Sequence, residues 1–140
     1  TPTRLHTSFL SASPLCWRWG TQVGDFQHFW WFCSVITIFW IEILGHLKSI
    51  VGYPVPSDYV TVSLGIRPLQ LEGMIHADWY FISHLLGTAK QLIALAWKSS
   101  APPSVGSWFA CLWHVLAMEL LSHKLPFGEE IYLQMAASAG

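Results

Sequence analysis

The chain has 140 residues, enough for one ordinary domain, and its formal net charge of −1 excludes the basic surface typical of nucleic-acid-binding proteins. Charged residues make up 11% of the sequence, less than half of the roughly 25% found in soluble domains. Hydrophobic residues make up 53%, nine residues are Trp and eight are Phe, and the mean hydropathy is +0.42. This composition indicates an integral membrane protein rather than a soluble domain.

The first 25 residues differ from the rest of the chain. The first acidic residue is Asp25, and before it come Arg4, Arg18 and several Ser and Thr residues. Leaders that are poor in acids and carry Arg and Ser are typical of organelle transit peptides. We expect residues 1–25 to form an N-terminal arm, which is either the remnant left after cleavage of a leader or a disordered or surface-lying segment.

Three cysteines are present, Cys16, Cys33 and Cys111, which is an odd number. Two of them, Cys33 and Cys111, lie inside apolar runs. We therefore expect buried thiols rather than a disulfide framework or a cysteine-based metal site.

The first apolar segment is 26–47, whose only formal charge is Glu42. A helix of this length spans about 33 Å, which matches the hydrocarbon core of a bilayer. Trp30 and Trp31 near its start are typical of residues at the membrane interface. The sequence therefore predicts a transmembrane helix here, followed by a Pro-containing loop at 51–60.

The second apolar segment is 59–97. As one helix it would be about 58 Å long, twice the thickness of a perpendicular span. It must therefore lie steeply tilted or be broken, and Pro68 is a plausible break. The charged residues scattered along it are Arg67, Glu72, Asp78 and Lys90.

A loop at 98–107 leads to a third apolar segment, 108–137. Together the three segments predict an all-α integral membrane protein. We expect a transmembrane helix or hairpin, together with long helices that are steeply tilted or nearly horizontal in the membrane.

Polar side chains recur at helical spacing in the last two segments, where residues three or four apart share a face. In a membrane such polar stripes must face protein or water, although a single membrane histidine more often serves only to hydrogen-bond a neighbouring helix. The first stripe contains Glu72, His76, Tyr80 and Ser83 or His84; the second contains Glu119, Ser122, His123 and Glu130.

Two short motifs make the sequence similar to a known family. "VSLGIR" (62–67), followed by His76 nine positions after the arginine, resembles the fifth helix of the proton-channel subunit a of F-type ATP synthases. "WHVLAMELLSHKLPFGEEIYLQMA" (113–136) resembles the last helix of the same family, and "WIEILGHLKSI" (40–50) resembles the segment upstream of the arginine. The resemblance covers roughly residues 38–138 and is that of a strongly diverged member.

The resemblance implies a role for particular residues. Arg67 corresponds to the essential arginine that faces the carboxyl groups of the rotor ring, or c-ring. The proton entry half-channel would be lined by His76, His114, Glu72, Tyr80 and Glu119. The exit half-channel would be lined by Glu42 and Glu130.

The sequence also departs from the family pattern. Leu71 and Leu121 stand where the family usually has Asn and Gln, and Pro68 lies where the family helix continues. Insertions occur around 51–60 and 88–107, and the first transmembrane helix of the family has no counterpart; whether a separate chain supplies that helix stays open.

By resemblance, the chain would be a multi-pass protein of the mitochondrial inner membrane, with a plastid or bacterial membrane as the alternative. It would be a non-catalytic subunit of a proton-transporting ATP synthase that neither binds nor hydrolyses nucleotide. Its partners would be the c-ring, other stator subunits and lipids such as cardiolipin, and not nucleic acid. No cofactor is expected, and a metal only as adventitious zinc on His76 and His114.

Two other functions remain open. His46, His84 and His114 lie in apolar segments and could supply axial ligands to haem in a membrane subunit of a respiratory complex. Alternatively, the chain is a purely structural membrane subunit in which Arg67 pairs with Asp78 or another neighbour.

Overall fold

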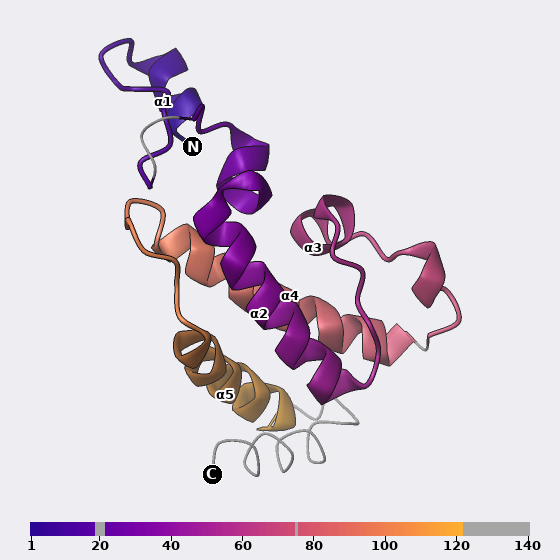
Figure 1. Cartoon of the computed structure of the whole chain (residues 1–140). Helices are drawn as coiled ribbons and strands as arrows, with labels where there is room; N and C mark the ends of the chain where they lie inside the picture. Colours follow the sequence, from indigo (N-terminus) through magenta and orange to yellow (C-terminus); the bar gives the residue numbers. More distant parts are fainter. Residues whose placement is uncertain (19–21, 75, 122–140) are drawn as a thin grey trace.

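The computed structural model describes residues 1–18, 22–74 and 76–121. Within these ranges the chain is helical and contains no β-strand, although Leu15 and Val23 form an isolated β-bridge. Figure 1 shows α2 lying across α4, with α5 along one side of this pair and α3 on the other. The helical elements are α1 (Pro2–Ser8), the π-helical turn η1 (His28–Phe32), α2 (Ser34–Val51), α3 (Tyr59–Leu64), the 3₁₀ turn η2 (Leu69–Leu71), α4 (His76–Leu95) and α5 (Val105–Leu121).

Helix α2 is long and apolar enough to cross a membrane, and it is the one such helix in the described ranges. Only 28% of this stretch is buried inside the fold, and its other residues are partly or fully exposed. Ile38 and Ile41 are among its exposed side chains. Exposed apolar side chains on a membrane-length helix are better accommodated by lipid than by water. The buried face of α2 consists of Ile36, Phe39, Trp40, Ile43 and Leu47.

The sequence placed this first helix at 26–47, and the structure shifts it toward the C-terminus. Residue Cys33 is extended (φ −61°, ψ 124°) and separates the π-helical turn η1 from α2. The helix then continues to Val51 and ends at Gly52, whose φ of 75° lies in the left-handed region. Glycine adopts this conformation without steric penalty, which explains why the helix stops there.

Helices α2, α4 and α5 share one hydrophobic core, as their mutual contacts show. Trp108 of α5 is fully buried and its indole Nε1 donates a hydrogen bond to the Leu85 carbonyl of α4 at 3.1 Å. Trp40 of α2 is also buried, and its indole donates to the Trp30 carbonyl at 2.8 Å. Both indoles therefore fill the core while their polar N–H groups are satisfied.

The segment 59–97 is not one 39-residue helix. Helix α3 begins at an Asp58 cap, whose carboxylate accepts from the Thr61 amide at 2.8 Å, and ends at Gly65 with φ 71°. Pro68 follows in an extended conformation and lacks the amide needed to continue a helix. Regular helix resumes only at His76, so the expectation of a continuous tilted helix is wrong and that of a break near Pro68 is confirmed.

Helix α5 begins at Val105, three residues before the start expected from the sequence. The Ser104 hydroxyl accepts a hydrogen bond from the Ser107 amide at 3.0 Å and caps the first turn. The remainder of the predicted segment, including Glu130, lies outside the described residues.

The N-terminal arm is folded over its described residues. After α1 the chain turns back on itself: Cys16 N–H donates to the Gln22 carbonyl at 2.7 Å, and Gly24 N–H donates to the Pro14 carbonyl at 2.8 Å. The arm projects from one end of the helical bundle (Figure 1).

Candidate functional site

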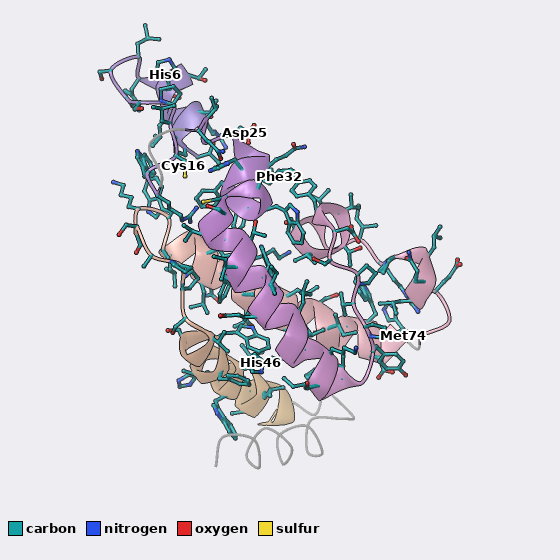
Figure 2. The ribbon with its side chains drawn as sticks, viewed as in Figure 1. His6, Cys16, Asp25, Phe32, His46 and Met74 are labelled. Atoms are coloured by element: carbon teal, nitrogen blue, oxygen red, sulfur yellow. The ribbon has the colours of Figure 1, made fainter. Side chains whose placement is uncertain are left out.

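Arg67 lies in the bend between α3 and α4, where its half-buried side chain bonds to three backbone carbonyls. Its Nε donates to the Leu71 carbonyl at 2.9 Å, and its Nη2 donates to the same oxygen at 2.6 Å. Nη2 also donates to the carbonyls of Glu72, at 3.0 Å, and of Met74. Figure 2 labels Met74 where the bend approaches the start of α4. The guanidinium therefore holds the bend together and is itself held in one position.

One terminal nitrogen of the Arg67 guanidinium has no hydrogen-bond partner in the described part of the chain. This nitrogen, Nη1, donates no hydrogen bond to any described residue, and no carboxylate among those residues forms an ion pair with it. The carbonyls that it contacts carry only partial charges. Arg67 is therefore a fixed cation that still lacks an anionic partner over the described part of the chain.

Exposed apolar side chains surround this arginine in the sequence. Ile66 is 53% exposed and Leu69 is 82% exposed, on either side of Arg67, and Leu64 is 48% exposed at the end of α3. We call Leu64, Ile66 and Leu69 the apolar rim. Exposed apolar side chains on both sides of an arginine in the sequence are compatible with a surface that faces lipid or another apolar protein.

The polar stripe of α4 follows the expected spacing, but it begins one turn later than predicted. His76 is the first residue of α4 and is exposed, and Tyr80 is 40% exposed. The rings of Tyr80 and His84 meet edge to face, with their centroids 4.5 Å apart. Glu72 lies in the bend before the helix, where it is exposed. It therefore does not belong to the stripe.

The other predicted site residues are dispersed. Glu42 is exposed on α2 and His114 is exposed on α5. Glu119 belongs to α5, but its side chain is outside the described part, as is all of Glu130. Among the described members of the predicted set, one hydrogen bond links two of them, Arg67 and Glu72, and it uses the Glu72 carbonyl rather than its carboxylate.

The histidines proposed as haem ligands occupy different helices. His46 of α2 packs edge to face against Phe109 of α5, with ring centroids 5.2 Å apart. His84 meets Tyr80, as described above, and His114 is exposed. His46 and His84 thus each pack against an aromatic ring, from α5 and from α4 itself.

A second cluster, whose side chains could bind a metal ion, was not predicted from the sequence. Cys16, His28 and Cys33 are all buried, and their ligand atoms lie within 4.8 Å of one another. The two Sγ atoms are 4.0 Å apart. Burial lowers the pKa of His28 and raises the pKa of the Cys33 thiol, because it disfavours the charged form of each group. Figure 2 labels Cys16 at the junction between the arm and the start of the helical bundle.

Local structure explains how these three residues meet. The Asp25 carboxylate accepts from the His28 amide at 2.7 Å and fixes the start of η1. Inside this turn the Cys33 amide donates to the His28 carbonyl at 2.9 Å, the i to i+5 bond of a π-helix. The fold-back of the arm then brings Cys16 against the turn. Of the three cysteines expected to be buried thiols, Cys16 and Cys33 are buried and Cys111 is half-buried.

No protein-family model matches the sequence, and no solved structure matches the fold.

Proposed function

We propose that this chain is a proton-translocating stator subunit of a membrane-embedded rotary ATP synthase, akin to the subunit a that its sequence resembles. In this proposal Arg67 faces the carboxyl groups of a rotor ring in the mitochondrial inner membrane. The observation that carries the proposal is the state of Arg67: a rigidly held cation without an anionic partner in the described chain, with Nη1 uncommitted.

The physical task of such a cation follows from electrostatics. A carboxyl group in lipid stays protonated, because desolvation raises its pKa by several units. A guanidinium about 4 Å away stabilises the carboxylate by roughly 4 kcal/mol at an effective dielectric of 20, which corresponds to about three pKa units. Arginine suits this task because it keeps its charge in an apolar environment. A rotor acid that reaches Arg67 would thus release its proton.

The apolar rim supports a rotor rather than a soluble partner. Leu64, Ile66 and Leu69 are exposed beside Arg67, and they match the apolar outer face of a ring of membrane helices. The surface that meets the ring would be the bend with α3 and the start of α4, in place of one long tilted helix.

The α4 stripe supports a proton path that leads to this surface. Exposed His76 and Tyr80 provide groups that can donate and accept protons, and imidazole exchanges protons readily near neutral pH. With Glu72 in the bend and His114 and Glu119 on α5, they would form the entry side. Glu42 and Glu130 would serve the exit side, and other stator subunits would complete both half-channels.

A second candidate is a structural membrane subunit without chemistry. The observation in its favour is that all hydrogen bonds of Arg67 go to backbone carbonyls within seven residues. In this case Arg67 would serve only to stabilise the bend, and its charge would have no partner in another subunit.

Photocrosslinking distinguishes these two functions. A photoreactive amino acid at Leu69, in the apolar rim, is expected to crosslink in native membranes to a small subunit with a membrane-embedded carboxyl group. Mass spectrometry of the product identifies that subunit. The matched control is Leu10, which is 84% exposed but lies in the N-terminal arm, and it should not yield this product. Products with lipid alone at position 69 would contradict the rotor contact.

A further inference from the structure

We propose that Cys16, His28 and Cys33 form a binding site for one Zn²⁺ ion at the junction between the N-terminal arm and η1. This inference is independent of the proposed function, because it uses neither Arg67 nor any of the proton-path residues. It also revises the expectation that the cysteines would be buried thiols outside any metal site.

The spacing of the ligand atoms fits zinc. Zn–S bonds of about 2.3 Å in a tetrahedral site place two thiolate sulfurs about 3.8 Å apart. The Sγ atoms of Cys16 and Cys33 are 4.0 Å apart, and all three candidate ligand atoms lie within 4.8 Å of one another. The two sulfurs are thus within a few tenths of an ångström of this separation. Rotation of the side chains would have to bring the His28 nitrogen, which lies at most 4.8 Å from them, to the roughly 3.5 Å that Zn–N and Zn–S bonds require.

A buried ring nitrogen of His28 independently indicates that a ligand binds here. Its side chain is only 6% exposed, and its Nε2 is buried without a hydrogen-bond partner among the described residues. A buried ring nitrogen without a partner is costly, because it has lost its bond to water and gained nothing in exchange. A metal ion at this atom would remove that cost.

The buried side chain of Arg18 is a second indication that an ion binds here. It is 9% exposed, its Nε and Nη2 have no partner among the described residues, and its guanidinium carbon lies 5.1 Å from the centroid of the Phe29 ring. Two thiols would each release a proton on binding Zn²⁺, and the resulting thiolates could accept hydrogen bonds from this guanidinium.

The donor set selects the type of metal. Two thiolates and one imidazole are soft or borderline ligands and suit Zn²⁺, whereas Mg²⁺ and Ca²⁺ require oxygen ligands. Three protein ligands leave the fourth tetrahedral position for water or another ligand. An ion here would fasten the arm to the start of the helical bundle.

The test is zinc binding by the full chain, purified in detergent and kept reduced. We expect one Zn²⁺ per chain by elemental analysis, and a sulfur-to-metal charge-transfer band when Co²⁺ replaces it. Cys16→Ser, His28→Gln and Cys33→Ser should each weaken zinc affinity by more than about 100-fold, beyond the loss typical of outer-shell partners. Cys111→Ser is the matched control, because Cys111 lies on α5 outside the cluster, and it should retain full affinity.

A second measurement needs no variant that might fail to fold. The melting temperature of the unmodified chain should rise with added Zn²⁺ and fall again with a chelator, because a ligand that binds only the folded state stabilises it. The proposal would be overturned if the melting temperature did not rise with Zn²⁺, or if Cys111→Ser lost as much zinc affinity as the three ligand variants. It would also be overturned by tight binding of Cu(I) but not Zn²⁺, or by a Cys16–Cys33 disulfide in protein isolated without reductant.

Discussion

Replacement of Arg67 by glutamine is expected to lower ATP-driven proton transport by roughly a thousand-fold in complexes that contain this chain. The estimate follows from about three pKa units of lost carboxylate stabilisation, since each unit is a tenfold change in proton affinity. Without the guanidinium, a rotor acid would keep its proton when it passes the stator. The measurement is acidification of inverted membrane vesicles, normalised to the amount of assembled complex.

Two variants serve as comparisons for this prediction. Arg67→Lys keeps a positive charge but cannot donate simultaneously to the three carbonyls through a planar fork, so we expect transport between that of the unmodified chain and Arg67→Gln. Arg4→Gln removes an exposed arginine from α1 and should leave transport unchanged. Normal transport by Arg67→Gln complexes would contradict the proposed role.

The same variants separate the rotor function from the structural one. Hydrogen bonds to charged groups contribute about 1.5–3 kcal/mol each, so loss of the Arg67 contacts should also weaken the bend. If Arg67 were only structural, Arg67→Gln would lower the yield of assembled complex, yet each assembled complex would transport protons at the normal rate.

Trp108→Ala is expected to have the largest effect on stability, lowering the free energy of unfolding by about 3–5 kcal/mol. Trp108 is fully buried in the core between α4 and α5, so its removal leaves a cavity of indole size. It also leaves the Leu85 carbonyl without the indole N–H that it now accepts at 3.1 Å. Chemical denaturation of the full chain in detergent, followed by circular dichroism, measures the change.

Two substitutions resolve the components of this effect. Trp108→Phe keeps most of the ring volume but removes the indole N–H. The Leu85 carbonyl lies within α4 and keeps its intrahelical partner, so we expect a loss of about 0.5–1.5 kcal/mol from this one hydrogen bond. Met118→Ala, at a position on the same helix that is 68% exposed, should change stability by less than about 0.5 kcal/mol. A Trp108→Ala loss no larger than that of Met118→Ala would show that α5 is not packed as described.

The helices could largely be predicted from the sequence, because apolar segments and their breakers are local features. The apolar run before Gly52 predicted α2, and Pro68 predicted the break in the second segment. The start of α2 could not be predicted, because it depends on the extended conformation of Cys33, which follows the π-helical turn. An apolar run does not show where a π-helical turn ends and a regular α-helix begins.

The surroundings of Arg67 could be predicted only in part. Its sequence position between two apolar stretches showed that its charge needed a partner, but not that three carbonyls of a bend would receive its hydrogen bonds. Those carbonyls become available only because Gly65 ends α3 and Pro68 prevents the helix from resuming at once. The stripe of His76 and Tyr80 was predictable, because it follows from helical spacing alone.

The cluster of Cys16, His28 and Cys33 could not be predicted from spacing. Cys16 lies 17 residues before Cys33, and the two meet only because the arm folds back on itself through bonds such as that from Cys16 N–H to the Gln22 carbonyl. No short motif encodes such a return. The nearest sequence signal is the pair of His28 and Cys33, five residues apart, beside a run of aromatic residues.

The central claim is that the free side of the Arg67 guanidinium meets a carboxyl group of a neighbouring rotor subunit. The most direct measurement is an electron cryo-microscopy structure, at side-chain resolution, of the complex purified from native membranes with this chain as the affinity handle. The proposal predicts a carboxyl oxygen of another chain within about 4 Å of Nη1, with the apolar rim against the same subunit. A structure in which Nη1 faces lipid or solvent, with no ring of membrane helices beside the bend, would contradict it.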